Sequence, residues 1–254
     1  MGLVLATTSG KGGVGKSCVS ASLGITFAGL GERVLLVDMD EGLGSLDLLL
    51  GLEGSAVSDL CDALVSKDIT DSAYETHIKN LSLIPAPKVV GQIDVELFKR
   101  FVRRADAVFD VVIFDFPAGL DFSLYSLMPT ITQFLCVATP DPVCLRASSA
   151  VGLRLEELGL NSRLIINRFN LKEHKKLKYR SIDGIIDTAS IRLLGIVPES
   201  EEINNLSVKH TLKKRGKPAQ AFFRIAERLR YKNIPLKNLK KIWGFENDDC
   251  PYCA

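Results

Sequence analysis

The segment TTSGKGGVGKSCVS, residues 7–20, carries the residues whose types and spacing most directly suggest chemistry. Residues 10–17 match the pattern GxxxxGK[ST], in which a glycine-rich loop turns its backbone N–H groups inward to form a nest for phosphate oxygens. In this pattern Lys16 neutralises phosphate charge and Ser17 offers its hydroxyl to Mg²⁺. Lys11 stands where the pattern accepts any residue, so it adds a positive charge that the loop's own phosphate does not require.

Three aspartates follow apolar runs that read as buried strands. Asp38 and Asp40 end LLVDMD, and Asp115 follows VVIF. Ligands of open parallel sheets bind beyond the carboxyl ends of the strands, so we expect the three carboxylates to converge on the phosphates. Carboxylate and hydroxyl oxygens suit Mg²⁺, and the sequence therefore predicts a magnesium–nucleotide site.

The elements that must position these residues follow from alternating apolar and amphipathic segments. Continuous apolar runs predict strands at 2–6, 33–40, 81–86, 109–117, 133–140, 162–169 and 193–199. Helices are predicted at 15–30, 45–51, 55–65, 92–106, 122–130, 143–158, 181–188, 201–208 and 217–230. The predicted fold class is α/β: a doubly wound, mostly parallel sheet forming a P-loop domain over 1–231, with a C-terminal tail over 232–254.

Composition is that of an ordinary globular protein, with 254 residues of which 46% are hydrophobic and 24% charged. No run approaches the roughly 18–20 apolar residues of a membrane-spanning helix, and the N-terminal segment lacks the charge and length of a signal peptide. We therefore expect a cytoplasmic protein. Four cysteines are then expected to be reduced thiols: Cys18, Cys61, Cys136 and Cys144.

Charge is distributed unevenly along the chain. Residues 1–170 hold 14 Lys and Arg against 20 Asp and Glu, whereas residues 171–254 hold 18 against 10. A basic C-terminal third favours contact with a polyanion, either nucleic acid or anionic lipid, and a solvated basic face is the alternative.

Six segments together resemble the MinD/ParA family of deviant-Walker-A P-loop ATPases, and among these the septum-site-determining MinD proteins most. They are SGKGGVGKS, LLVDMDEGLGSLDLLLGLE, FDVVIFDFPAGLD, ATPDPVCLR, LIINRF and LLGIVPESEEI, and the resemblance covers about residues 2–230. It implies a homodimer that forms with ATP, ATP hydrolysis that requires Mg²⁺, and a role in placing the division site.

The resemblance also implies roles for individual residues. Lys11 would reach across the dimer to the partner's phosphates, and Asp40 would orient or deprotonate the attacking water. The implied catalytic residues are Lys11, Lys16 and Asp40, and the implied magnesium ligands are Ser17, Asp38 and Asp115. The implied nucleotide-binding residues, with Asn167 recognising adenine near Pro198, are Gly10, Gly12, Gly13, Val14, Gly15, Lys16, Ser17, Cys18, Asn167, Arg168 and Pro198.

The sequence departs from the family pattern at three places. Phe116 stands where the family usually has serine, Gly44-Ser45 replaces Arg-Asn, and ASSA at 147–150 replaces a run of acids. All three lie in segments that the family uses for switching and partner contact. We therefore expect intact nucleotide chemistry and altered binding of MinC-like and MinE-like regulators.

The tail segment NIPLKNLKKIWGF, residues 233–245, has apolar residues at helical spacing flanked by lysines, and it ends in Trp243 and Phe245. This pattern is typical of a helix lying in a membrane interface, here predicted over 234–245. A helix docked on the body with Trp243 packed is the alternative. One copy is expected to bind anionic lipid weakly and two copies on a dimer more tightly, giving a peripheral position on the inner face of the cell membrane.

Two rival functions remain open from the sequence. The basic segments 171–180 and 209–217 are compatible with a DNA-bound ParA-type segregation ATPase. The terminal CPYC, with Cys250 and Cys253, is compatible with an iron–sulfur carrier ATPase whose dimer would share a metal or cluster site, although a CxxC without function is the simpler interpretation.

Overall fold

The computed structural model describes residues 2–41, 44–88, 94–119, 125–129, 132–170, 182–213, 216–230 and 234. Within these residues eight strands form one sheet in the order β3-β4-β2-β5-β1-β6-β7-β8. The strands are β1 (Leu3–Thr8), β2 (Val34–Asp38), β3 (Tyr74–Glu75), β4 (Leu81–Ile84), β5 (Val111–Asp115), β6 (Gln133–Ala138), β7 (Asn161–Phe169) and β8 (Leu193–Pro198). All neighbours pair in parallel except β3, which is antiparallel to β4.

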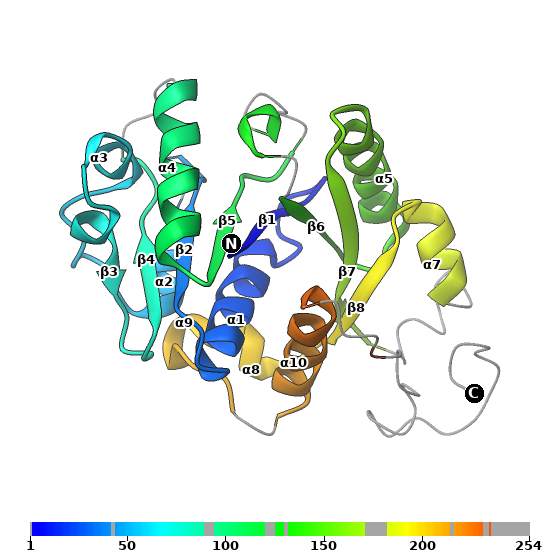
Figure 1. The fold of residues 1–254 in the computed structure, drawn as a ribbon. Coiled ribbons are helices and arrows are strands. Elements are labelled where there is room, and N and C mark those ends of the chain that lie inside the picture. Colours follow the sequence, from blue (N-terminus) through cyan, green and yellow to red (C-terminus); the bar gives the residue numbers. More distant parts are fainter. Residues whose placement is uncertain are drawn as a thin grey trace.

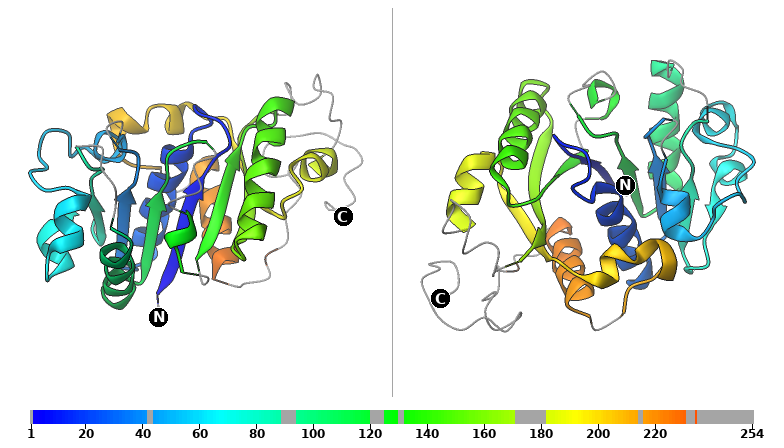
Figure 2. Two further views of the ribbon diagram at one scale, coloured as in Figure 1. Left: turned by 90° about the horizontal axis from the view of Figure 1, so that it is seen from above. Right: turned by 180° about the vertical axis from the view of Figure 1, so that it is seen from behind.

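Helices cover both faces of the sheet (Figure 1). They are α1 (Lys16–Gly29), α2 (Leu46–Leu50), α3 (Leu60–Val65), α4 (Val95–Val108), α5 (Pro142–Glu157), α7 (Ile182–Ala189), α8 (Glu201–Asn204), α9 (Leu206–Lys209) and α10 (Lys217–Leu229). Two short 3-10 helices, η1 (Ile69–Ser72) and η2 (Tyr125–Leu127), lie between them. Figure 2 shows α1 and α10 on one face and α4 and α5 on the other. The predicted doubly wound α/β class is therefore confirmed.

The apolar core lies between these layers, because strands covered on both faces bury nearly every side chain. All five residues of β2 and of β5 are buried, and Val4 to Thr8 of β1 are buried as well. Leu23 and Phe27 of α1 are fully buried against this layer. No helix in the described part of the chain is long and apolar enough to cross a membrane.

Several predicted boundaries were wrong. The first strand continues to Thr8 instead of ending at residue 6, and the predicted helix 201–208 is two short helices, α8 and α9. The helix predicted from 55 begins only at Leu60, because the Asp59 side chain accepts a hydrogen bond from Cys61 N and caps it. Of the helix predicted at 122–130, the described residues contain only η2.

Candidate functional site

The loop between β1 and α1 has the backbone that its glycines permit. Gly13 and Gly15 have φ of 78° and 85°, the left-handed region that favours glycine. A Cβ on Gly10 would lie 2.5 Å from the backbone of Ala147 in α5, so a larger residue does not fit there. Cβ atoms on Gly12 and Gly13 would meet nothing within 4 Å. The loop is therefore packed against α5 on one side and open on the other, where an anion can approach.

Lys16 is buried at the start of α1 and does not extend into solvent. Its Nζ lies 2.9 Å from Oδ2 of Asp115 and donates a hydrogen bond of 3.3 Å to the hydroxyl of Ser17. The Asp115 carboxylate is fully buried, so the two charges compensate each other away from water. The structure thus brings together Lys16, Ser17 and Asp115, three residues that the sequence assigned to one site.

Two hydroxyl groups that the sequence analysis missed hold the other oxygen of Asp115. Oδ1 accepts hydrogen bonds from Thr7 Oγ1 at 2.7 Å and from Ser20 Oγ at 2.6 Å. Thr7 is the second-to-last residue of β1 and Ser20 lies one turn into α1, so both flank the glycine loop. No signal in the sequence pointed to them, because their role depends on β5 lying beside β1.

Asp38 lies on the neighbouring strand at the same level as Asp115, since the two residues are register partners of β2 and β5. Its Oδ1 accepts from the backbone N–H of Asp40 at 3.0 Å, and its Oδ2 accepts from those of Ser45 and Leu46 at 3.0 and 3.1 Å. Burial and the nearby negative charge of Asp115 raise the pKa of Asp38 to about 6. A cation placed between two such carboxylates would relieve this repulsion.

Asn167 closes the side of the loop near β7. Its Nδ2 donates a hydrogen bond of 2.8 Å to the carbonyl of Val14, and the side chain is almost completely buried. Its Oδ1 is buried without a hydrogen-bond partner, which leaves an acceptor available for a donor supplied from outside the chain. Arg168 beside it is exposed and has φ of 53°, a conformation that is uncommon for arginine.

The remaining site residues differ in exposure. Pro198 is buried at the end of β8, where it pairs with Phe169 just after Arg168, and Cys18 is half-buried. Asp40 is half-buried, whereas Lys11 is exposed on the outer part of the loop. Burial raises the pKa of Asp141, but hydrogen bonds from Thr139 and Cys144 and the positive charge of Lys11 give a net decrease. Lys11 is therefore an exposed charge that acts on Asp141, whereas Lys16 is buried and paired with Asp115.

Phe116, one of the departures from the family pattern, is buried in an aromatic cluster. Its ring centroid lies 5.0 Å from that of Tyr125 in an edge-to-face arrangement and 6.0 Å from that of Phe134. The Tyr125 hydroxyl is hydrogen-bonded at 2.5 Å to the hydroxyl of Thr8, at the entrance of the glycine loop. The cluster therefore links the residue after Asp115 to the loop.

The other two departures also have structural consequences. A Cβ on Gly44 would lie 2.7 Å from the Cβ of Ala86, so a small residue is required there. Ala147 packs on the glycine loop and Ser148 is fully buried. The first two residues of the 147–150 segment are therefore occupied by packing inside the protein. Only Ser149 and Ala150 of this segment are available for contact with a partner.

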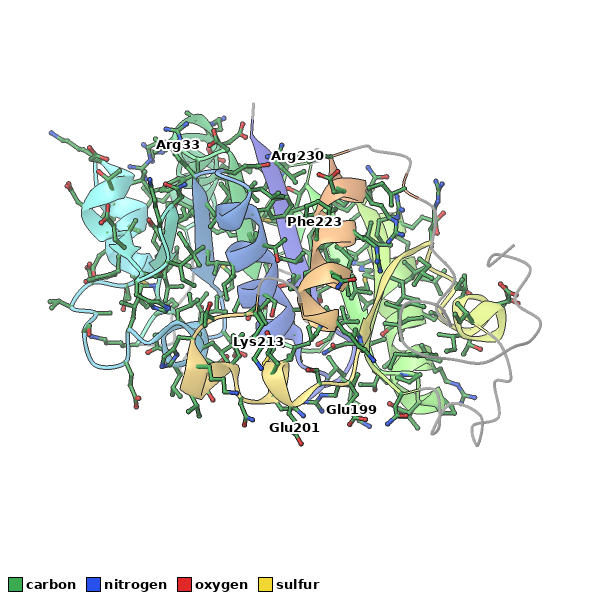
Figure 3. All side chains as sticks on the ribbon, turned by 90° about the horizontal axis from the view of Figure 1, so that it is seen from below. Arg33, Glu199, Glu201, Lys213, Phe223 and Arg230 are labelled. Carbon is green, nitrogen blue, oxygen red and sulfur yellow. The ribbon has the colours of Figure 1, made fainter. Side chains whose placement is uncertain are left out.

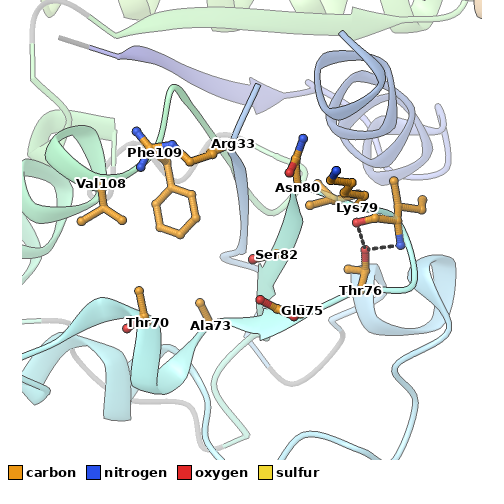
Figure 4. Close-up of a pocket in the computed structure, with 12 residues that line it drawn as sticks. Arg33, Thr70, Ala73, Glu75, Thr76, Lys79, Asn80, Ser82, Val108 and Phe109 are labelled. Atoms are coloured by element: carbon orange, nitrogen blue, oxygen red, sulfur yellow. Dashed lines mark hydrogen bonds between the residues drawn. The ribbon is translucent and has the colours of Figure 1, made fainter. Parts of the chain in front are cut away.

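Two hollows lie near the ends of the sheet. One of about 450 Å³ is lined by Asp38, Gly44 and Lys88 among others, and it opens beside the carboxylate pair. The other, of about 690 Å³, lies among Arg33, Lys79, Asn80 and Phe109 at the amino ends of β2 and β4 (Figure 4). It is at the opposite end of these strands from Asp38, so it does not belong to the nucleotide site.

Several sequence hypotheses fall outside the described residues. These are the membrane segment 234–245 except Ile234, both cysteines of CPYC, the basic segment 171–180, and residues 214 and 215 of the second basic segment. Within the described residues no group of three or more His, Cys, Asp or Glu side chains is arranged to hold a metal ion by itself.

The residues present fit a magnesium nucleotide. The open glycine face accommodates phosphate oxygens, and the free Oδ1 of Asn167 can accept from an exocyclic amine. Ser17, Asp38 and Asp115 supply hard oxygen donors, and Mg²⁺ characteristically retains water and binds through few protein ligands.

Comparison with known proteins agrees with this geometry. Residues 5–212 match the family model of the CobQ/CobB/MinD/ParA nucleotide binding domain. The septum site-determining protein MinD of Thermotoga maritima is 35% identical over 249 residues, which cover 94% of this chain and 92% of that protein. MinD of Bacillus subtilis is 33% identical, with 95% of this chain and 94% of that protein covered.

Solved structures of MinD proteins are also similar to this chain. The MinC:MinD cell division protein complex of Aquifex aeolicus contains a chain with a TM-score of 0.81 and 30% identity, covering 92% of this chain and 98% of that one. MinD of Pyrococcus horikoshii complexed with Mg-ADP has a TM-score of 0.76 and 27% identity, covering 90% and 96%. The chain therefore belongs to the CobQ/CobB/MinD/ParA nucleotide-binding family and, within it, to the P-loop ATPases of the MinD group that place the cell-division site.

Proposed function

We propose that the chain is a magnesium-dependent ATPase switch that dimerises with ATP and cycles on and off a membrane surface. The single observation that carries the proposal is the contrast between the two lysines of one loop. Lys16 is buried and paired with Asp115, whereas Lys11 is exposed on the same loop. An exposed cation at a phosphate site is positioned to serve a second molecule.

The chemistry follows from the residues of the site. The glycine loop and Lys16 would hold the phosphates, and Ser17, Asp38 and Asp115 would hold Mg²⁺ directly or through water. The bound cation would supply charge neutralisation of the phosphate oxygens. Asp40, two residues after the end of β2, would orient or deprotonate the attacking water. Asn167 would accept a hydrogen bond from the adenine amine.

Lys11 would complete the site of the partner copy. A cation brought to the transferring phosphoryl group stabilises the charge that develops in the transition state, as an arginine finger does. If that cation comes from the other subunit, hydrolysis requires the dimer. Once phosphate is released, Lys11 would lose the phosphoryl group that it contacts on the partner, and the dimer would be weakened.

The membrane is the proposed surface because segment 234–245 has an apolar stripe flanked by lysines. A single such segment binds weakly, and the pair in an ATP dimer gains avidity, so attachment would follow the nucleotide state. A MinC-like protein is the first partner to test, since the Aquifex aeolicus structure is a MinC:MinD complex. Phe116 and the 147–150 segment favour a changed response to MinE-like regulators.

The test is gel filtration of wild type, Lys11→Ala and Lys16→Ala with Mg²⁺ and ATP. We expect wild type to elute as a dimer with ATP and as a monomer with ADP. Lys16→Ala should remain monomeric because it cannot hold the nucleotide. Lys11→Ala should bind ATP with near-normal affinity, dimerise poorly and lose most hydrolysis. An ATP dimer of unchanged stability in Lys11→Ala would exclude the proposed role of this lysine.

A further inference from the structure

Four arginines gather where α10 packs beside β8. Arg163 is on β7, Arg192 directly precedes β8, and Arg224 and Arg228 lie one turn apart on α10; we refer to these four residues as the arginine cluster. Arg228 Nη1 donates to the carbonyl of Leu194 at 2.9 Å, and Arg163 Nη2 lies 3.5 Å from that of Leu193. Side chains from a strand and a helix thus converge on consecutive residues of β8.

The cluster concentrates positive charge, with Arg163, Arg224 and Arg228 half-buried and Arg192 exposed. Burial lowers the pKa of Arg163, and the positive charge of Arg192 lowers it further. Burial likewise lowers the pKa of Arg228, together with the charges of Arg224 and Arg163. In the described part of the chain no carboxylate lies within ion-pairing distance of Arg163, Arg192 or Arg224. An external anion would stabilise these three guanidinium ions, and guanidinium binds phosphate oxygens bidentately.

The position of the cluster indicates which anion. Arg228 Nε donates at 2.8 Å to the carbonyl of Ile234, the first residue of the predicted membrane segment. Ile234, where the predicted segment begins, therefore lies beside the cluster, and a membrane that binds the segment would come close to these arginines. Phe223, which directly precedes Arg224 on α10, is 45% exposed (Figure 3). Exposed aromatic and basic side chains are both typical of surfaces at the membrane interface.

We propose that the arginine cluster is a second membrane contact, on the body of the protein, which binds the phosphate headgroups of anionic lipids next to the point where the tail leaves. This inference rests on the proposed membrane function and adds a site outside the tail. It predicts that the body, and not only the tail, is selective for anionic over zwitterionic lipid.

The test is co-sedimentation of the full-length chain, with Mg²⁺ and a non-hydrolysable ATP analogue, with vesicles of phosphatidylglycerol and phosphatidylcholine. The variant is Arg192→Gln/Arg224→Gln, which spares the hydrogen bonds of Arg163 and Arg228. The matched control is Arg100→Gln/Arg103→Gln, which removes two exposed arginines from α4 on the other face of the sheet. Basic residues near an anionic surface each contribute about fivefold, so the variant should bind about 30-fold more weakly and the control nearly as wild type. Both should retain the wild-type melting temperature and ATP dimer.

The outcomes separate the two proposals. If wild type binds anionic vesicles and the variant binds as tightly as the control, the cluster is not a lipid site although the membrane function stands. If wild type binds no vesicles, the membrane function itself fails and this inference with it. If the variant loses affinity for a 60-base-pair DNA duplex but not for vesicles, the cluster is a nucleic-acid contact. Tighter vesicle binding by the variant would show that the cluster holds an acidic segment of the chain instead.

Discussion

At the scale of single residues, the site consists of a few side chains whose burial determines their roles. Asn167 is the clearest case, because one amide end holds the loop through Val14 and the other end is a buried acceptor. Lys16 is similarly defined by Asp115, which in turn is held by two hydroxyl groups. A change at any of these positions acts on the shape of the loop as well as on the ligand.

Replacing Asn167 with alanine should weaken ATP binding about tenfold or more. The change leaves the Val14 carbonyl without its donor and removes the proposed acceptor for adenine, and each such loss costs about 1–3 kcal/mol in a buried site. Titration of a fluorescent ATP analogue measures the effect. Asn170→Ala is the matched control, since its amide bonds an exposed glutamate, Glu199. Equal affinities of the two variants would contradict the assignment.

Asp38 should make stability depend on pH in the absence of nucleotide and metal. Its folded pKa of about 6 lies above the ordinary value of 3.8, so the folded chain retains a proton that the unfolded chain releases. This contribution to stability is fully present below the unfolded pKa and is lost as pH rises through the folded one. The free energy of unfolding should fall by about 1–2 kcal/mol from pH 5 to pH 7.5 on account of this group.

Urea denaturation of wild type and Asp38→Asn at several pH values tests this expectation. The variant carries no titrating group at this position, so its stability should vary less with pH over the same range. Parallel curves for the two chains would show that Asp38 titrates normally.

At the scale of elements, β1, β2 and β5 do most of the positioning. Their carboxyl ends carry Thr7, Asp38 and Asp115 at one level, and the parallel register makes their proximity unavoidable. The aromatic cluster of Phe116, Tyr125 and Phe134 then ties the segment after β5 to Thr8.

Replacing Phe116 with alanine should destabilise the fold by about 3–5 kcal/mol, because a fully buried ring is lost from a packed cluster. For a chain of this size that corresponds to a decrease in Tm of about 10 °C, measurable by thermal unfolding followed by circular dichroism. Phe223→Ala removes an exposed ring on α10 and should change Tm little. A small effect of Phe116→Ala would mean that the surrounding residues collapse into the space.

The strands could be predicted because each is a continuous run of apolar residues. The glycine loop could be predicted because its residues are consecutive in the sequence and match a known motif. The seven strands predicted all exist, with ends displaced by at most two residues. The two-residue strand β3 was missed, since Tyr74 and Glu75 are too few to give a pattern. Thr7, Ser20 and Tyr125 could not be assigned to the site, because only the folded sheet brings them to Asp115 and the loop.

At the scale of the whole molecule, the role proposed for the exposed Lys11 would make catalysis depend on association of two copies. If each active site needs a lysine from a second copy, the ATPase activity per molecule should rise with protein concentration and level off once all chains are paired. Steady-state phosphate release over a hundredfold range of concentration measures this. A specific activity that does not change with concentration, in a range where gel filtration shows monomers, would contradict a shared site.

The bond from Arg228 to the Leu194 carbonyl also bears on how two copies can meet. Sheets can associate by adding a strand from another chain along an open edge, where unpaired backbone groups act as a template. Here β8 is an edge strand with a carbonyl occupied by arginine, and the opposite edge, β3, is only two residues long. Both borders of the sheet are therefore poor templates for strand addition. The proposed dimer would then form through the face that carries the nucleotide loop, where association can depend on ATP.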